Sequence, residues 1–127
     1  MNTRRTPREL ARDLSARAAG KYQMAAVLSD RRGIFAWGWN HSVRIIGANA
    51  VETVHAEEHA IKRANPRRLS GSTLTVYGEK NTGKLLFARP CKERCEVMAK
   101  KHGVAKIEYH ASDGWRAEKL AYVAEAR

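Results

Sequence analysis

The sequence predicts an α/β fold in which a sheet with some parallel strands packs against helices. The chain has 127 residues, which is enough for one domain with a single core. Hydrophobic residues make up 43% of it, so we expect a packed core instead of a disordered chain. Short apolar runs typical of strands alternate with helix-like periodicity, and this order favours crossover connections between parallel strands.

The N-terminal segment, residues 1–20, is predicted to contain a helix. Thr6 can cap its first turn, and Glu9 completes a capping box with it. Pro7 suits the first helical position, and Gly20 is a plausible C-terminal stop.

The next part of the chain predicts a hairpin followed by a helix. Residues 22–29 and 34–39 have the apolar character of two strands, and a turn at 30–33 joins them. Residues 40–52 lack clear periodicity and are expected to form a loop over one end of the sheet. Residues 53–64 are predicted to form a helix.

The C-terminal half predicts a strand, a helix and two further strands. Residues 74–77 form the third strand, and a helix is expected from residue 90 to about residue 102. Residues 105–110 form the fourth strand. After a turn at 112–114, residues 115–120 are expected to pair back as the fifth strand.

Composition points toward phosphate-bearing partners and away from membranes. The formal net charge is +11, and such a surface attracts free nucleotides as well as single-stranded nucleic acid. No apolar run approaches the roughly 20 residues of a membrane span, and the basic N-terminus lacks the apolar stretch of a secretory signal. The chain has two cysteines, Cys91 and Cys95. Two nearby thiols in a chain without an export signal are typical of a reducing compartment. We therefore expect a cytoplasmic protein with no membrane partner.

Two predicted helix starts carry the residues that point to chemistry. One holds His55 and Glu57, and the other holds Cys91 and Cys95. A catalytic zinc site uses three protein ligands and keeps a fourth position for water, and one histidine with two cysteines supplies that count. On one helix, the i and i+4 spacing of the cysteines would place both on the same face. Bound zinc acidifies water, and a carboxylate such as Glu57 can accept the proton.

The motif His55-Ala56-Glu57, followed by Pro90-Cys91 and Cys95, resembles the signature of the cytidine and deoxycytidylate deaminase superfamily. The predicted element order agrees with the fold of that superfamily over residues 22–120. The resemblance implies a cytidine deaminase-like three-layer α/β sandwich, in which a five-stranded mixed sheet carries helices on both faces. It also implies that residues 1–127 form a single zinc-dependent deaminase domain.

Carried onto this sequence, the resemblance implies that His55, Cys91 and Cys95 hold Zn²⁺. Glu57 is then the catalytic proton shuttle, and the backbone of Ala56 helps to hold the carbonyl of the base. These residues would constitute the metal site and the floor of the substrate pocket.

Two further residues, Asn40 and Pro90, are implied as substrate contacts. Gly38-Trp39-Asn40 resembles a Gly-x-Asn at the end of the second strand of many members. The sequence departs from the common pattern in its Cys-x-x-x-Cys spacing, which is one residue longer, and in Ala88-Arg89, where many relatives have serine or threonine. Arg89 is expected to meet solvent or phosphate.

The implied function is a hydrolytic deamination that converts cytosine to uracil in a nucleotide or nucleic acid. Within the enzyme class, the alternative is an adenosine deaminase that acts on RNA or tRNA. From another class, the alternative is a non-catalytic zinc-containing module that binds nucleic acid. The resemblance also implies a homo-oligomer.

A rival interpretation uses overlapping residues. His55-Ala56-Glu57-Glu58-His59 fits the His-x-x-Glu-His pattern of inverted zinc peptidases, in which His55 and His59 would bind zinc and Glu58 would be the base. It leaves Cys91 and Cys95 without a role, so the deaminase pattern is favoured.

Overall fold

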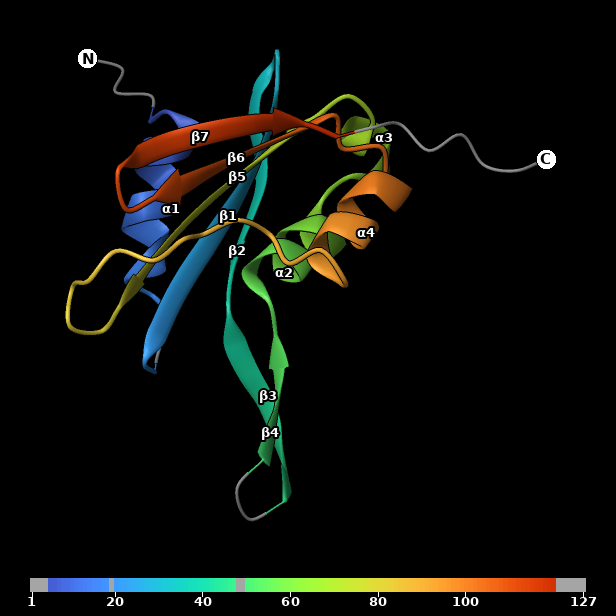
Figure 1. Cartoon of the computed structure of the whole chain (residues 1–127). Coiled ribbons are helices and arrows are strands. Elements are labelled where there is room, and N and C mark those ends of the chain that lie inside the picture. The colour runs from blue at the N-terminus through green and yellow to red at the C-terminus, as the bar shows by residue number, and fades with distance from the viewer. Residues whose placement is uncertain (1–4, 19, 48–49, 121–127) are drawn as a thin grey trace.

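The structure is a computed structural model that describes residues 5–18, 20–47 and 50–120, with only the backbone described for 42–47 and 50–53. Its centre is a five-stranded sheet in the order β2-β1-β5-β6-β7 (Figure 1). The strands are β1 (Tyr22–Asp30), β2 (Gly33–Trp39), β5 (Thr73–Lys80), β6 (Lys106–Ala111) and β7 (Gly114–Lys119). Strands β5 and β6 are parallel, whereas β1 is antiparallel to both neighbours and β7 is antiparallel to β6. The predicted mixed sheet is confirmed.

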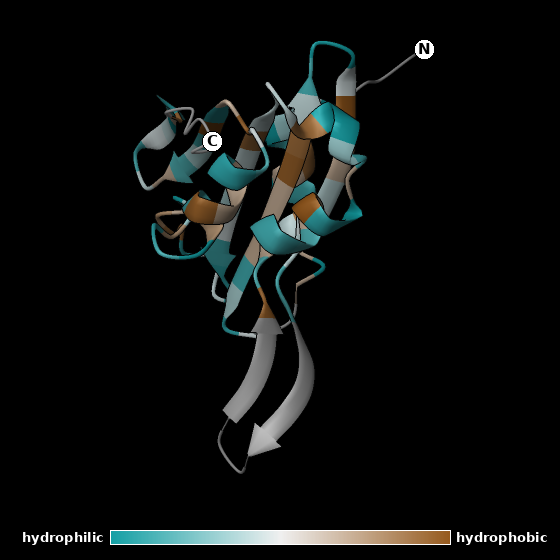
Figure 2. Cartoon of the chain, turned by 90° about the vertical axis from the view of Figure 1, so that its right-hand side faces the viewer, coloured by the Kyte–Doolittle hydropathy of each residue, from teal (hydrophilic) through white to brown (hydrophobic). Residues whose placement is uncertain are grey.

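Helices cover both faces of this sheet, as predicted. Helix α1 (Pro7–Ser15) lies on one face, and α2 (Ala56–Arg63) and α4 (Cys95–Lys101) lie on the other (Figure 1). A short helix, α3 (Pro66–Leu69), follows α2. The middle of β1 is fully buried because it packs against helices on both sides, which explains its continuous apolar run. Figure 2 shows this hydrophobic strand between helices whose outer surfaces are hydrophilic.

Helix α1 begins as the sequence predicts. The Glu9 backbone N–H donates to the Thr6 hydroxyl at 3.1 Å, and the Thr6 N–H donates to the Glu9 carboxylate at 2.9 Å. The helix ends at Ser15, well before Gly20. The Ser15 hydroxyl donates to the carbonyl of Arg12 at 2.7 Å, a local bond that competes with helix continuation. Among the described residues, no helix is long and apolar enough to cross a membrane.

The expected loop at residues 40–52 is wrong, because most of this segment is a hairpin. Strands β3 (His41–Gly47) and β4 (Ala50–Val54) pair antiparallel as a separate two-stranded sheet that projects from the body of the molecule (Figure 1). The register of the hairpin shifts twice, and each irregularity breaks the period-two alternation that reveals a strand in a sequence. Because β4 runs to Val54, α2 begins at Ala56 and not at residue 53.

Gly38 allows strand β2 to approach helix α2 closely. A Cβ atom at this position would lie 2.6 Å from the Ala60 nitrogen and 2.7 Å from the His59 Cβ. We expect Gly38→Ala to lower the free energy of unfolding by about 1–3 kcal/mol, the usual cost of overpacking, in urea titrations. Gly33→Ala gives the comparison for backbone strain alone, since Gly33 has a φ of +121° but open space around it. The steric explanation fails if Gly38→Ala leaves the free energy of unfolding unchanged.

Candidate functional site

The three metal-binding residues predicted from the sequence converge between α2 and α4. His55 is the N-cap of α2, and its Nδ1 lies 3.2 Å from Cys95 Sγ and 4.0 Å from Cys91 Sγ. One ligand atom from each residue lies within 4.8 Å of the other two. His55 reaches this point from the end of β4, and the cysteines reach it from the segment that enters α4. The predicted grouping of His55, Cys91 and Cys95 is confirmed as a spatial cluster.

The cysteines do not share a helix, so that expectation is wrong. Helix α4 begins at Cys95 and not at residue 90, and Cys91 precedes a turn over residues 92–94. The turn is closed by a bond from the Glu96 N–H to the Cys91 carbonyl at 2.8 Å. The Cys95 N–H also points to Cys91 Sγ at 3.3 Å. The additional residue of the Cys-x-x-x-Cys motif is therefore accommodated by a wider turn, which still brings both sulfurs toward His55.

The donor set fits zinc. Typical Zn–N and Zn–S bond lengths place tetrahedral ligand atoms about 3.5–3.8 Å apart, which lies between the two separations observed here. Both cysteines are free thiols, and burial, followed by the nearby Glu57 carboxylate, raises the pKa of the Cys95 thiol. A divalent cation reverses this effect because it stabilises the thiolate, so two thiols beside an imidazole form a set that zinc would complete.

Glu57 lies beside this cluster at the edge of a cavity. Glu57 is 5% exposed, and burial raises the pKa of its carboxyl group. The cavity, of about 310 Å³, is lined by Met24, Asn40, Val54, His55, Ala56, Glu57, Arg89 and Cys91. A carboxyl group with a raised pKa next to a metal-binding cluster has the placement of a general acid or base.

The three predicted substrate contacts occupy different positions. Asn40 lines the cavity, but its side chain also holds strand β1, since Oδ1 accepts from the Met24 N–H at 2.8 Å and Nδ2 donates to the Tyr22 carbonyl at 2.9 Å. Ala56 is buried in the cavity wall at the first position of α2. Pro90 is fully buried and is absent from the described cavity lining.

His59 and Glu58, which the inverted zinc-peptidase interpretation uses, form contacts with residues outside the metal-binding cluster. His59 Nδ1 accepts the Trp39 backbone N–H at 3.1 Å, and its ring packs edge-on against Trp39 and His41. Glu58 forms an ion pair with Arg94 at 2.7 Å. Burial is the largest single effect and opposes ionisation of Glu58, but the hydrogen bonds from Arg94 and from the His55 backbone, with the neighbouring positive charges, together outweigh it and lower the pKa of this carboxyl. In the described part of the chain, the cluster able to hold a metal ion includes His55 but not His59.

Arg89 forms an ionic network that the sequence did not predict. Its Nε and Nη2 donate to the two oxygens of Glu118 at 3.0 Å each, and it also pairs with Glu96. Nη1 donates to the Pro90 carbonyl at 3.0 Å, and the Tyr109 hydroxyl donates to Glu118. The network ties β7 and α4 to the segment that carries Cys91. The expectation that Arg89 meets solvent or phosphate is therefore wrong, because its guanidinium is already paired with two carboxylates.

Loss of the Glu118 charge should destabilise the protein above about pH 4.5. Hydrogen bonds from Arg89, and then from Tyr109, lower the pKa of Glu118 to about 2 from an ordinary 4.5. The stabilisation is fully present above pH 4.5 and is lost as the pH falls through the folded-state pKa. Because the side chain is 39% exposed, screening limits the contribution to about 1 kcal/mol.

Urea unfolding of the native protein and of Glu118→Gln tests this pH dependence. The difference in unfolding free energy should be full at pH 7 and should shrink by about pH 2.5. Glu93→Gln, at an exposed position of the turn before α4, is the matched control and should show no such difference. A Glu118→Gln difference that does not change with pH would contradict the assignment.

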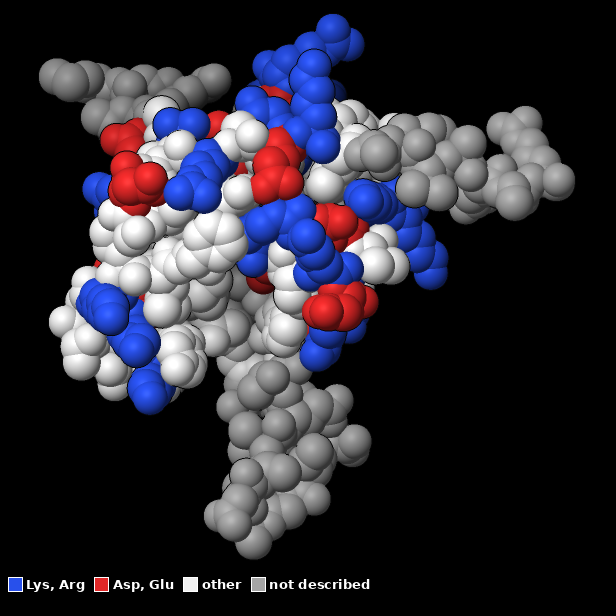
Figure 3. Space-filling model, viewed as in Figure 1, with Lys and Arg blue, Asp and Glu red and all other residues white. Residues whose placement is uncertain are grey.

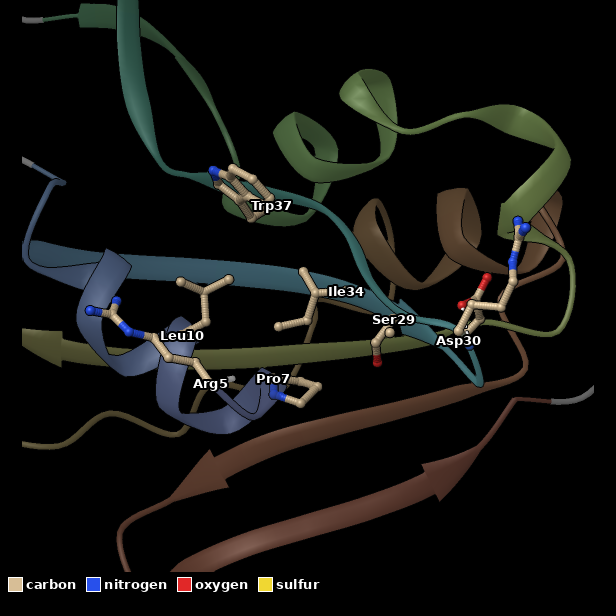
Figure 4. A pocket seen from close by; sticks show the side chains of 9 residues that line it. Arg5, Pro7, Leu10, Ser29, Asp30, Ile34 and Trp37 are labelled. Atoms are coloured by element: carbon tan, nitrogen blue, oxygen red, sulfur yellow. Dashed lines mark hydrogen bonds between the residues drawn. The ribbon is translucent and has the colours of Figure 1, made fainter. Parts of the chain in front are cut away.

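Two larger cavities lie away from the metal-binding cluster. Figure 4 shows the first, of about 530 Å³, where Pro7 and Leu10 of α1 face Ile34 and Trp37 of β2. The second, of about 480 Å³, is lined largely by arginines at the β1–β2 turn and around α3. Asp30 contributes to both but is held by two hydrogen bonds from Arg68, at 2.7 and 2.8 Å. In the described residues, neither cavity combines a carboxyl group with metal-binding side chains, so the small cavity is the candidate active site.

Comparison with known proteins identifies the family of the chain. Residues 1–111 match the family described as the cytidine and deoxycytidylate deaminase zinc-binding region. Curated proteins gave no match to the chain.

Solved structures with the same fold include three deaminases. The apo deoxycytidylate (dCMP) deaminase from cyanophage S-TIM5 is 21% identical, with a TM-score of 0.59 over 82% of this chain and 79% of that chain. The cytidine deaminase from Burkholderia pseudomallei is 17% identical, with a TM-score of 0.60 over 90% of each chain. The cytidine deaminase from Mycobacterium leprae is 19% identical, with a TM-score of 0.54 over 87% of this chain and 88% of that chain. These likenesses establish the fold.

Proposed function

Because the chain belongs to the cytidine and deoxycytidylate deaminase zinc-binding family, we propose that it hydrolyses the exocyclic amino group of cytosine in a nucleotide or nucleic acid. The observation that carries the proposal is the meeting of His55, Cys91 and Cys95 at a cavity that also contains the buried Glu57. Hydrolysis of an amidine-like C–N bond needs activation of water and proton transfer. A metal-binding cluster and a carboxyl group at one cavity provide these two functions.

The reaction adds water and releases ammonia. When bound by His55 and the two cysteines, zinc supplies Lewis-acid activation of water near neutral pH. Glu57 accepts a proton from the attacking water as its oxygen bonds to C4 of cytosine. Glu57 passes this proton to N3, then takes the second proton from the new C4 hydroxyl and delivers it to the amino nitrogen. The C4–N4 bond breaks, C4=O forms, and uracil and ammonia leave.

The walls of the cavity orient the base in this scheme. Asn40 makes two hydrogen bonds to β1, one through Oδ1 and one through Nδ2. One amide hydrogen and one lone pair of Oδ1 are left for contact with a substrate. Ala56, at the start of α2, lines the same cavity, which supports a role for its backbone in holding the carbonyl of the base. The guanidinium of Arg89 is paired with Glu96 and Glu118, and it also donates to the Pro90 carbonyl. Arg89 therefore contributes by holding the segment that carries Cys91 in position.

A substrate panel tests the proposed function. Purified zinc-loaded protein is incubated with cytidine, deoxycytidine, their monophosphates, and single-stranded DNA and RNA that contain one cytosine, together with the adenine counterparts. We expect ammonia release with uracil as the product from at least one cytosine substrate. Release from adenine substrates alone would favour an adenosine deaminase. Tight binding of nucleic acid with no turnover on any substrate would favour a non-catalytic zinc module.

A further inference from the structure

Two strongly exposed aromatic side chains, Tyr22 and Phe87, flank the candidate active site. Tyr22 is 48% exposed and Phe87 is 59% exposed. Tyr22 is the first residue of β1, two positions before Met24, and the Asn40 side chain donates to its carbonyl. Phe87 lies two positions before Arg89. Since Met24, Asn40 and Arg89 all line the cavity, each exposed ring lies next to one part of its wall.

Both rings lie on the sheet face that carries the metal-binding cluster. Met24 packs against the core cluster between the sheet and α2, and side-chain alternation places Tyr22 on the same face of β1. The Phe87 ring contacts Tyr109 edge-on at a centroid distance of 5.4 Å, and Tyr109 belongs to the same core cluster. Two exposed aromatic rings therefore lie on the cavity's side of the sheet, one near Met24 and one near Arg89.

Each ring is accompanied by cations. The Nζ atoms of Lys21 and Lys80 lie 5.6 and 5.8 Å from the centre of the Tyr22 ring. The Arg116 guanidinium lies 5.8 Å from the centre of the Phe87 ring. Arg116 also meets Asp113 at 3.3 Å, whereas Lys21 and Lys80 form no ion pair with the described residues. Figure 3 shows basic side chains over the loop after β5 and over the segment that leads into α4.

This arrangement matches the chemistry of single-stranded nucleic acid. Aromatic rings at a protein surface stack with successive bases, and nearby lysines and arginines neutralise the backbone that links those bases. A free nucleoside would fill the cavity of about 310 Å³ and leave both exposed rings unused. A polynucleotide that places one cytosine in the cavity extends past the opening in both directions, where the two rings lie.

Resting on the proposed deaminase function, we propose that the substrate is a cytosine within a single-stranded polynucleotide, whose flanking bases stack on Tyr22 and Phe87. Stacking is tolerant of base identity, so these contacts contribute affinity with little sequence preference. The neighbouring lysines make binding sensitive to salt.

The test compares an oligonucleotide with a mononucleotide. Values of kcat/KM are measured for a short single-stranded DNA with one central cytosine, for the matching RNA, and for the cytidine monophosphates. Native protein should prefer one of the oligonucleotides to the monophosphate by at least about tenfold. Tyr22→Ala and Phe87→Ala should each lower kcat/KM for that oligonucleotide by about 5- to 100-fold, the range expected for one stacked base, with a much smaller loss for the monophosphate.

Trp37→Ala is the matched control, because Trp37 is an exposed aromatic residue that lines the separate cavity beside α1. It should leave kcat/KM for both substrates within about twofold of native. Equal losses on oligonucleotide and monophosphate in the Tyr22 and Phe87 variants would overturn the stacking role. A native preference for the monophosphate would overturn it as well.

Binding of a fluorescently labelled oligonucleotide separates this proposal from the proposed function. If native protein releases no ammonia from any substrate but Tyr22→Ala and Phe87→Ala weaken binding, the deaminase function fails and the stacking surface stands. Unchanged binding in both variants overturns the stacking surface whatever the activity. A changed oligomeric state with unchanged oligonucleotide kinetics would place the rings at a contact between copies and would also overturn it.

Discussion

Glu57→Gln is expected to lower kcat for ammonia release by about 10²–10⁴-fold or more, because glutamine cannot carry the proton from water to the leaving amine. Glutamine keeps the size of the side chain, so the buried position stays filled and unfolding should remain cooperative. Zinc content should also stay at the native value, since Glu57 is not among the three clustered ligands. The measurement is steady-state ammonia release on the substrate that the panel identifies.

The neighbouring Glu58 gives the matched control for that substitution. Glu58→Gln removes the ion pair with Arg94 but leaves Glu57 in place, so we expect kcat to stay within about tenfold of native. The inverted-peptidase interpretation predicts the reverse order, because Glu58 would then be the base. Glu57→Gln protein that releases ammonia at the native rate would exclude the proposed mechanism.

Cys95→Ser is expected to abolish stoichiometric zinc binding and to lower the thermal stability of the zinc-loaded protein. Cys95 is fully buried, and its sulfur lies 3.2 Å from His55 Nδ1, so its loss leaves two of the three clustered ligands. At a zinc concentration 1,000 times the Kd, bound metal stabilises a native protein by ~4 kcal/mol, and this increment should disappear. Metal analysis and thermal unfolding with and without a chelator measure both effects.

The same experiment separates the two candidate ligand sets. Native protein treated with chelator should unfold at a lower temperature than before, and Cys95→Ser should show little further response to the chelator. His59→Ala should keep its zinc, because the His59 ring is held by the Trp39 backbone and not by the cluster. Full zinc occupancy in a Cys91→Ala, Cys95→Ala double variant would instead support a site built from His55 and His59.

The metal-binding cluster could be predicted because its signal is short-range in sequence. His55 and Glu57 are two residues apart, Cys91 and Cys95 are four apart, and each pair precedes or enters a helix. The conformation that joins the cysteines could not be read in the same way. Two conformations bring both sulfurs toward one point: a helix that begins at residue 90, and a wide turn followed by a helix that begins at Cys95. Residue types alone do not distinguish these two conformations.

The Arg89 network depends on contacts that tertiary structure creates. Arg89 meets Glu118 only because β7 pairs back along β6, and it meets Glu96 only because the turn before α4 folds beside it. Glu118 is 29 residues from Arg89, and Glu96, seven residues away, is separated from it by the turn before α4, so no single helix or strand connects Arg89 to either partner. The β3–β4 hairpin was missed for a related reason, since its two register shifts conceal the alternation of a paired strand.

Titration of zinc into metal-free protein, with ammonia release from the identified cytosine substrate recorded at each addition, is the direct test of a zinc-dependent deaminase site at His55, Cys91 and Cys95. Activity should be absent without metal, rise in proportion to added zinc and reach a plateau at about one equivalent per chain. In a parallel titration with Co²⁺ as a probe, thiolate-to-metal absorption from Cys91 and Cys95 should reach its plateau at the same ratio. Ammonia release by metal-free protein, or full activity without metal at the two cysteines, would contradict the assignment of this site.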